Sequence, residues 1–182
     1  MTFSPEDIAA FLELRGFKRE IAGEHDFTAA VETIAAMHEI RCGLIVSGTY
    51  GCGKTRLCNA IAELFGAPFR VRLGLSAELV KFDRDWQDYH ALDPFGGNVY
   101  LDDLGAESPA NSFGIRYETV GDFIMQFHER HASGAMLILN TNFNLAEIDA
   151  RYGGRFVSRL KELCFPLKLT GTDKRVWRKV ER

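Results

Sequence analysis

The amino-acid sequence predicts an α/β protein with a doubly wound parallel sheet of about five strands flanked by helices. The 182 residues are 46% hydrophobic and 26% charged, which is the balance of an ordinary globular domain. Short apolar runs alternate along the chain with longer segments of helical periodicity, and this alternation is typical of parallel strands joined by helices. Because we find no repeat, low-complexity segment or linker, we predict a single domain.

Residues 1–40 predict two helices that pack on a core formed by residues 41–182. Ser4-Pro5-Glu6-Asp7 is typical of a helix start, because Ser4 can cap the first turn and the two acids face the positive end of the helix dipole. We expect this helix to end at Gly16. The second helix is expected over residues 28–41, with Gly43 ending it.

The rest of the chain alternates between expected strands and expected helices. The strands are predicted at residues 44–46, 69–73, 98–101, 135–139 and 165–169. The helices are predicted at residues 54–65, 76–90, 116–131, 145–150 and 155–163, and a turn at residues 93–97. Since each strand is followed by a helix, the strands should run parallel.

Charge is distributed unevenly along the chain. Residues 1–150 hold 12 Lys and Arg against 22 Asp and Glu, whereas residues 151–182 hold ten against three. A basic C-terminal tail beside an acidic body suggests contact with phosphates or with an acidic partner, and a solvated charge cluster explains it equally well. The sequence shows no membrane-spanning apolar run, no signal pattern and no metal-like or disulfide-like cysteine spacing, so we expect a soluble cytoplasmic protein that contacts no membrane.

The strongest motif is Gly-Thr-Tyr-Gly-Cys-Gly-Lys-Thr at residues 48–55, which fits the Walker A pattern of a phosphate-binding loop between a strand and a helix. Its glycines let backbone N–H groups wrap a phosphate, and the helix that follows adds its dipole. We expect Lys54 to reach the β- and γ-phosphates of ATP and the Thr55 hydroxyl to bind Mg²⁺. The predicted nucleotide-binding residues are Gly48, Thr49, Tyr50, Gly51, Cys52, Gly53, Lys54, Thr55 and Arg56.

Two further strand ends carry polar residues that suit the same site. Asp102 and Asp103 follow an apolar strand, which is the Walker B pattern: Asp102 is assigned to Mg²⁺ and Asp103 to the base that activates water. Asn140-Thr141-Asn142 follows a later strand, and Asn142 is placed to hydrogen-bond the γ-phosphate or the attacking water. Both groups should lie at the carboxyl edge of the sheet.

A fourth block, Gly154-Arg155-Phe156-Val157-Ser158-Arg159-Leu160, places two arginines on one face of a short helix. An arginine offered to the nucleotide of a neighbouring subunit would stabilise charge in the transition state. From spacing alone, a solvated basic helix face is the simpler explanation.

These blocks, GTYGCGKT, VYLDDLGAE, LILNTNF and GGRFVSRL, occur in this order over about residues 40–176, with KLTGTDKR after them. In that combination the chain resembles the AAA+ ATPases of the bacterial helicase-loader group, of the DnaC and DnaI type, and the related IstB transposition ATPases. The resemblance implies a P-loop NTPase core of the AAA+ kind, ATP and Mg²⁺ as cofactors, and no separate helical lid domain. It assigns Lys54 and Thr55 to phosphate and Mg²⁺, Asp102 to Mg²⁺, Asp103 to the base, Asn142 to sensor 1, Arg159 (rather than Arg155) to a trans-acting arginine finger and Arg175 to a sensor 2 equivalent.

The resemblance also implies partners. Such proteins place single-stranded DNA along a helical or ring-like homo-oligomer that forms with ATP, and here Lys81 and Arg84 are candidate phosphate contacts or simply exposed helix charges. A replicative helicase is the expected protein partner, although about forty residues before the first core strand cannot easily supply an added helicase-binding domain. The adenine contacts are expected in residues 21–27.

Four functions remain open at this point. The leading hypothesis is an ATPase that couples ATP to DNA or a replication partner, with weak hydrolysis until an oligomer or DNA completes the site. An IstB-like transposition ATPase would bind duplex DNA and a transposase instead. A small P-loop nucleotide kinase would need an arginine-rich lid, and residues 105–113 do not resemble one. A binding module with little turnover is disfavoured by Asp102 and Asp103.

Overall fold

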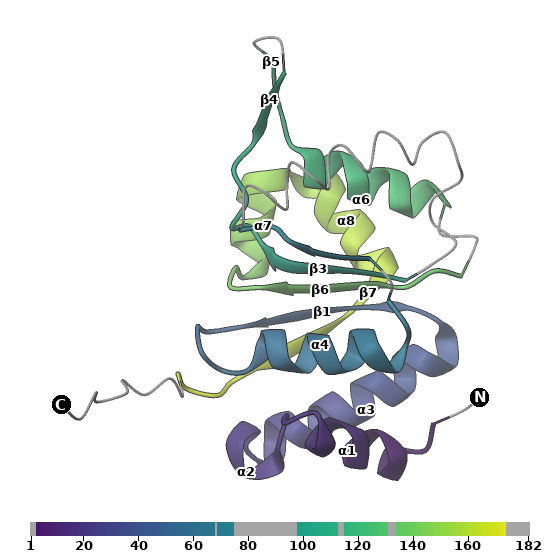
Figure 1. The fold of residues 1–182 in the computed structure, drawn as a ribbon. Helices are drawn as coiled ribbons and strands as arrows, with labels where there is room; N and C mark the ends of the chain where they lie inside the picture. Colours follow the sequence, from purple (N-terminus) through teal and green to yellow (C-terminus); the bar gives the residue numbers. More distant parts are fainter. Residues whose placement is uncertain (1–2, 68, 75–97, 113–114, 131–133, 174–182) are drawn as a thin grey trace, which may run out of the picture.

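The computed structural model describes residues 3–67, 69–74, 98–112, 115–130 and 134–173 (Figure 1). Several expectations fall outside the described residues. These are the helix at 76–90 with Lys81 and Arg84, the turn at 93–97, and the basic tail from residue 174 with Arg175.

The fold is built on a five-stranded sheet in the order β2-β3-β6-β1-β7, and every neighbouring pair is parallel. The prediction of a parallel α/β sheet of about five strands is therefore confirmed. After β1, the chain forms β2, β3 and β6 on one side of β1 and then β7 on its other side. The carboxyl end of β1 is therefore a topological switch point, which is where ligands bind in open α/β sheets. The strands are β1 (Gly43–Gly48), β2 (Phe69–Arg72), β3 (Val99–Leu104), β6 (Leu137–Thr141) and β7 (Cys164–Leu169).

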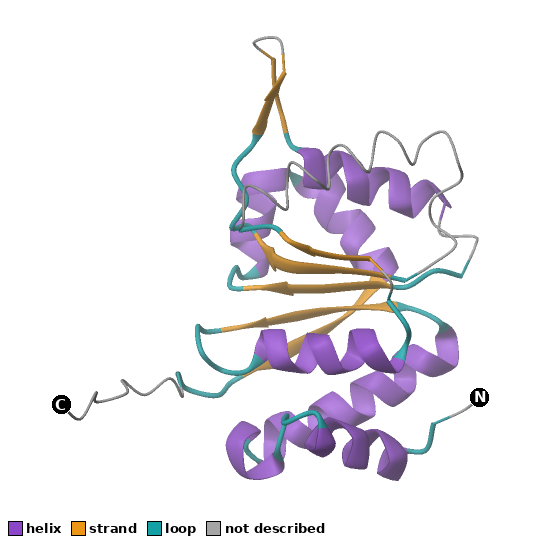
Figure 2. Cartoon of the chain, viewed as in Figure 1, coloured by secondary structure: helices purple, strands orange, loops and turns teal. Residues whose placement is uncertain are grey.

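Helices cover both faces of this sheet (Figures 1 and 2). Alternate residues of each strand point to opposite faces, so Leu101 and Leu139 belong to one hydrophobic cluster while Tyr100 and Ile138 belong to the other. The first cluster packs under α6 (Thr119–Arg130), α7 (Leu145–Tyr152) and α8 (Gly154–Leu163). The second packs under α4 (Lys54–Leu64) and the N-terminal helices. In the described ranges, every helix is too short or too polar to span a membrane.

The N-terminal segment forms α1 (Pro5–Leu14), α2 (Arg19–Ala22) and α3 (Glu24–Ile40). Ser4 caps α1 as predicted, because its hydroxyl accepts from the Asp7 N–H at 3.2 Å. The expected role of Gly43 as a helix stop is wrong: Arg41 takes the left-handed position with φ 52°, and Gly43 begins β1. A Cβ on Gly43 would lie 2.2 Å from the Leu137 carbonyl oxygen, so this glycine permits the close approach of β1 and β6.

The expected helix at residues 116–131 begins later than the sequence predicts, at Thr119. Before it, β4 (Ala110–Ser112) and β5 (Ile115–Tyr117) pair antiparallel. Figure 1 shows this hairpin standing out from the body above α6. The physical reason is local, since Ile115-Arg116-Tyr117 contains a β-branched and an aromatic residue that favour a strand over a first helical turn.

Candidate active site

The phosphate-binding loop connects β1 to α4 at the carboxyl edge of the sheet. Gly51 and Gly53 have φ of 74° and 105°, a backbone conformation that side chains rarely permit. The Lys54 ammonium donates to the carbonyl oxygens of Gly48 at 2.9 Å and Thr49 at 2.7 Å, and the side chain is buried. The loop thus holds its own lysine through two of its backbone carbonyls.

Thr55 and Asp102 meet at the point where α4 begins and β3 approaches its end. The Asp102 Oδ1 accepts hydrogen bonds from Thr55 Oγ1 at 3.2 Å and from the Tyr100 hydroxyl at 2.9 Å. One carboxylate and one hydroxyl, completed by phosphate oxygens and water, form the oxygen-only set that Mg²⁺ prefers. In the described part of the chain, no group of three or more His, Cys, Asp or Glu is placed to hold a metal ion.

Asn140 is the site residue that sequence reasoning missed. It is fully buried within β6, and its Nδ2 donates to Asp102 Oδ1 at 2.6 Å and to the Tyr100 hydroxyl oxygen at 2.9 Å. Its Oδ1 accepts from the backbone N–H of Asp103 at 2.8 Å. A polar residue inside an apolar strand must find a partner, and that signal in LILNT could have found Asn140.

Asp103 and Asn142 reach the same cavity from two neighbouring strands. Asp103 has φ 66°, a left-handed conformation that costs a non-glycine residue about 1 kcal/mol or more. Asn142 follows Thr141, whose hydroxyl donates to the Leu104 carbonyl at 2.7 Å and thereby ties the ends of β6 and β3 together. The two predicted catalytic side chains are therefore close to the phosphate loop in space.

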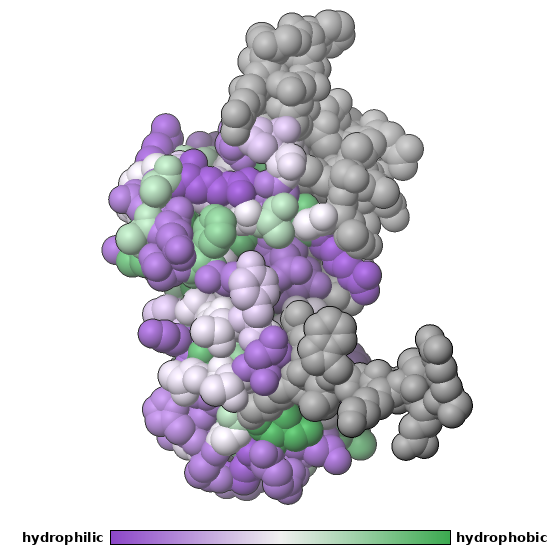
Figure 3. All heavy atoms as spheres, turned by 90° about the vertical axis from the view of Figure 1, so that its left-hand side faces the viewer, coloured by the Kyte–Doolittle hydropathy of each residue, from purple (hydrophilic) through white to green (hydrophobic). Residues whose placement is uncertain are grey.

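The cavity has a volume of about 590 Å³. It runs from the phosphate loop to the N-terminal segment, and Figure 3 looks onto this carboxyl edge of the sheet, where hydrophilic and pale residues predominate. Gly48 and Thr49 do not line the cavity, although both were predicted to bind the nucleotide. Their carbonyl oxygens accept hydrogen bonds from Lys54. The lining consists of Gly16, Phe17, Lys18, Ile21 and Ala22, the loop and helix residues 50–56, and Asp103, Ala106 and Asn142.

Arg159 is not part of this lining. It lies on α8, where its Nη1 donates to both carboxylate oxygens of Glu162 at 3.0 and 3.1 Å. Hydrogen bonds from His128 and then from Arg159 hold the pKa of the exposed Glu162 below its usual value. Arg155 is exposed on the same helix. The structure therefore brings Lys54, Thr55, Asp102, Asp103 and Asn142 together and leaves both arginines outside.

Comparison with known proteins identifies the fold. No protein-family model and no curated protein matches the chain. Among solved structures, the DnaC helicase loader is similar with a TM-score of 0.51 and 21% identity, over 78% of this chain and 88% of that chain. AMPPCP-bound DnaA from Aquifex aeolicus is similar with a TM-score of 0.50 and 17% identity, over 81% of this chain and 46% of that chain. The fold is that of the AAA+ ATPases.

The segment after β7 packs against the phosphate loop. Thr49 Oγ1 donates to the Gly171 carbonyl at 3.0 Å, and a Cβ on Gly51 would lie 2.9 Å from Asp173 Cα. From the other side, the Asp26 carboxylate of α3 accepts from the Thr170 N–H at 2.8 Å and the Gly171 N–H at 3.0 Å. Asp26 thus anchors the segment that lies behind the loop.

Replacing Asp26 by asparagine is expected to lower the free energy of unfolding by about 2 kcal/mol at neutral pH, because it weakens charge-assisted hydrogen bonds in a buried position. Burial raises the pKa of Asp26, but hydrogen bonds from Thr170, His25 and Gly171 outweigh it and leave the pKa below the ordinary 3.8. A lowered folded-state pKa stabilises the protein above the unfolded value, and this stabilisation is lost as the pH falls through the folded value.

Urea unfolding of the Asp26→Asn protein and the wild type at neutral and acidic pH checks this expectation. The difference between the two should shrink as the pH falls below 3.8. The exposed Asp122→Asn change on α6 is the matched control. Equal stability of the Asp26→Asn protein and the wild type at neutral pH would show that the anchor contributes nothing.

Proposed function

We propose that the protein binds ATP with Mg²⁺ and hydrolyses it. The observation that supports this best is the 3.2 Å contact between Thr55 Oγ1 and Asp102 Oδ1, since it joins the phosphate loop to the Walker B carboxylate at one point. Thr55 and Asp102 would hold Mg²⁺, which neutralises developing charge on the phosphates. Lys54 would bind the β- and γ-phosphates, Asp103 would accept a proton from the attacking water, and Asn142 would orient that water or the γ-phosphate.

The adenine ring would lie at the N-terminal end of the cavity. Phe17, Ile21 and Ala22 line that end, and Phe17 stacks nearly parallel on Phe27 with ring centroids 6.0 Å apart. A half-exposed Ile21 offers apolar surface that a purine could cover. This placement uses residues 17–22, slightly before the 21–27 segment that the sequence indicates.

We further propose that the ATPase acts as an oligomer and couples its nucleotide state to single-stranded DNA or a replicative helicase. The support is the fold shared with a protein described as the DnaC helicase loader, together with the position of Arg159 outside its own cavity. In an oligomer, Arg159 would leave its contact with Glu162 and bind the γ-phosphate of the ATP held by a neighbouring protomer. The transposition alternative predicts duplex DNA as the ligand instead.

ATP hydrolysis measured against protein concentration, with no DNA, single-stranded DNA or duplex DNA at a fixed salt concentration, tests this function. We expect activity per protomer to rise steeply with concentration and to rise further with single strands, because the neighbour completes the site. The Lys54→Ala protein should be inactive at every concentration. Stimulation by duplex alone would favour the transposition ATPase, and activity that is independent of both concentration and DNA would contradict the oligomeric proposal.

A further inference from the structure

The end of β3, just before the turn at residues 105–107, holds Asp103 in an unfavourable backbone conformation. Asp103 is left-handed with φ 66°, and its carbonyl accepts from the Ala106 N–H at 2.9 Å. Gly105 has φ 98°, and a Cβ there would lie 2.6 Å from the Phe143 ring. A chain segment persists in such a conformation only when surrounding groups hold it there.

Arg151 of α7 is the group that holds this turn. Its Nη1 donates to the Gly105 carbonyl, and its Nη2 donates to the Glu107 carbonyl and, at 3.1 Å, to Glu107 Oε1. The other Glu107 carboxylate oxygen accepts from the Gly105 N–H at 2.9 Å. The Arg151 guanidinium and the Glu107 carboxylate therefore both hydrogen-bond to the backbone of residues 105–107.

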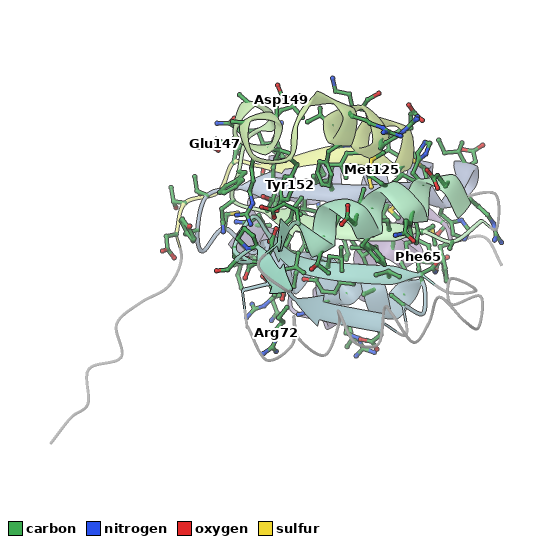
Figure 4. The ribbon with its side chains drawn as sticks, turned by 90° about the horizontal axis from the view of Figure 1, so that it is seen from above. Phe65, Arg72, Met125, Glu147, Asp149 and Tyr152 are labelled. Atoms are coloured by element: carbon green, nitrogen blue, oxygen red, sulfur yellow. The ribbon has the colours of Figure 1, made fainter. Side chains whose placement is uncertain are left out.

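The cluster around Arg151 contains one buried carboxylate, and two acidic side chains face the one guanidinium. The Glu107 side chain is 2% exposed and that of Arg151 is 22% exposed. The Tyr152 hydroxyl also donates to Glu107, and burial together with the Glu107 carboxylate raises the pKa of Tyr152, so the phenol remains a donor. Glu118 adds a second carboxylate 3.8 Å from Arg151 Nη2. Figure 4 shows Tyr152 turned toward the body of the molecule, whereas Glu147 and Asp149 of the same helix lie at its rim.

None of Arg151, Glu107 and Tyr152 lines the 590 Å³ cavity, whereas Asp103 and Ala106 do. We propose that Arg151 is a positioning residue for hydrolysis, whose guanidinium fixes the turn at residues 103–107 and thereby holds the Asp103 carboxylate at the nucleotide site. This inference rests on the proposed ATPase function. It separates Arg151 from Arg159, because Arg151 acts within its own chain and through Asp103.

The test variant is Arg151→Lys, which keeps the positive charge beside Glu107 and Glu118. An ammonium is a compact point charge and cannot donate in a planar fork to two carbonyls and a carboxylate. We expect the rate per bound nucleotide to fall by about 10- to 100-fold, because small displacements of a catalytic group carry that cost. The dissociation constant for ATP should stay within about 3-fold of the wild type.

The matched control is Arg41→Lys, an exposed arginine at the amino end of β1, which should change neither quantity. A purely structural role for Arg151 would lower the number of nucleotide-binding sites or the midpoint of unfolding and leave the rate per occupied site unchanged. That result would overturn the proposal.

A double-mutant cycle with Asp103→Asn gives the sharper measurement. If Arg151 acts through Asp103, adding Arg151→Lys to the Asp103→Asn protein should leave the residual rate unchanged within about 2-fold. If the double variant instead loses rate by the product of the two single-variant factors, the two residues act independently and the proposal is overturned. If the wild type hydrolyses no ATP under oligomer-forming conditions, both the proposed function and this inference are overturned. If the wild type is active and the Arg151→Lys variant is equally active, only this inference is overturned.

Discussion

Replacing Arg159 by alanine is expected to lower ATP hydrolysis by about 1000-fold or more while leaving nucleotide binding nearly intact. The Arg159 side chain is 33% exposed on α8 and lies outside the lining of its own cavity, so its loss leaves that binding site unchanged. A finger from a neighbour stabilises charge that develops only in the transition state, and its removal therefore lowers the rate rather than the affinity. Hydrolysis at saturating ATP and binding of a fluorescent ATP analogue measure the two effects separately.

The matched control for Arg159→Ala is Lys161→Ala, which removes an exposed cation from the same helix. Mixing the Arg159→Ala and Lys54→Ala proteins adds a test of action in trans. A protomer that binds ATP but lacks the finger should regain activity beside a protomer that lacks Lys54 and still has Arg159. If the Arg159→Ala protein turns over at the wild-type rate, Arg159 is not the finger.

Asp103→Asn is the second change with a large expected effect. Loss of a general base should lower the rate by about 100- to 10,000-fold. Asparagine has the same size and tolerates the left-handed backbone that Asp103 adopts, so the turn and the ATP affinity should survive. Asp102 keeps its contact with Thr55 in this variant, and Mg²⁺ binding is expected to persist.

Single-turnover hydrolysis at saturating ATP, together with the ATP dissociation constant, checks this prediction. The Asp122→Asn protein serves as the control, because that carboxylate is exposed on α6. A wild-type rate in the Asp103→Asn protein would exclude Asp103 as the base. A loss of ATP affinity equal to the loss of rate would instead assign Asp103 to nucleotide binding.

Local sequence patterns were enough to predict a loop between a strand and a helix at residues 48–55 and a parallel sheet of about five strands. Residues 48–55 hold the whole motif in consecutive positions, and Gly51 and Gly53 adopt the positive φ that the pattern requires. The apolar runs that predict five strands do so because a strand buried on both faces is apolar throughout. The same patterns failed at residues 110–118, where a short hairpin competes with a first helical turn and the sequence contains signals for both.

The choice between Asn140 and Asn142 needed the tertiary structure. Both follow an apolar run, and only the packing of α4 and β3 against β6 shows that Asn140 reaches Asp102 and Thr55. Sequence alone favoured Asn142 because it stands beyond the strand, and Asn142 does line the cavity.

The sequence by itself predicted the phosphate-binding loop and the strands of the parallel sheet, because those patterns depend on neighbours along the chain. The tertiary structure decided what supports the site. Asp26 bonds to Thr170, 144 residues away, and Arg151 to Glu107, 44 residues away. Each of these charges is costly to bury alone and becomes stable only when folding brings its partner within hydrogen-bond distance, so neither contact leaves a local pattern that a sequence can show.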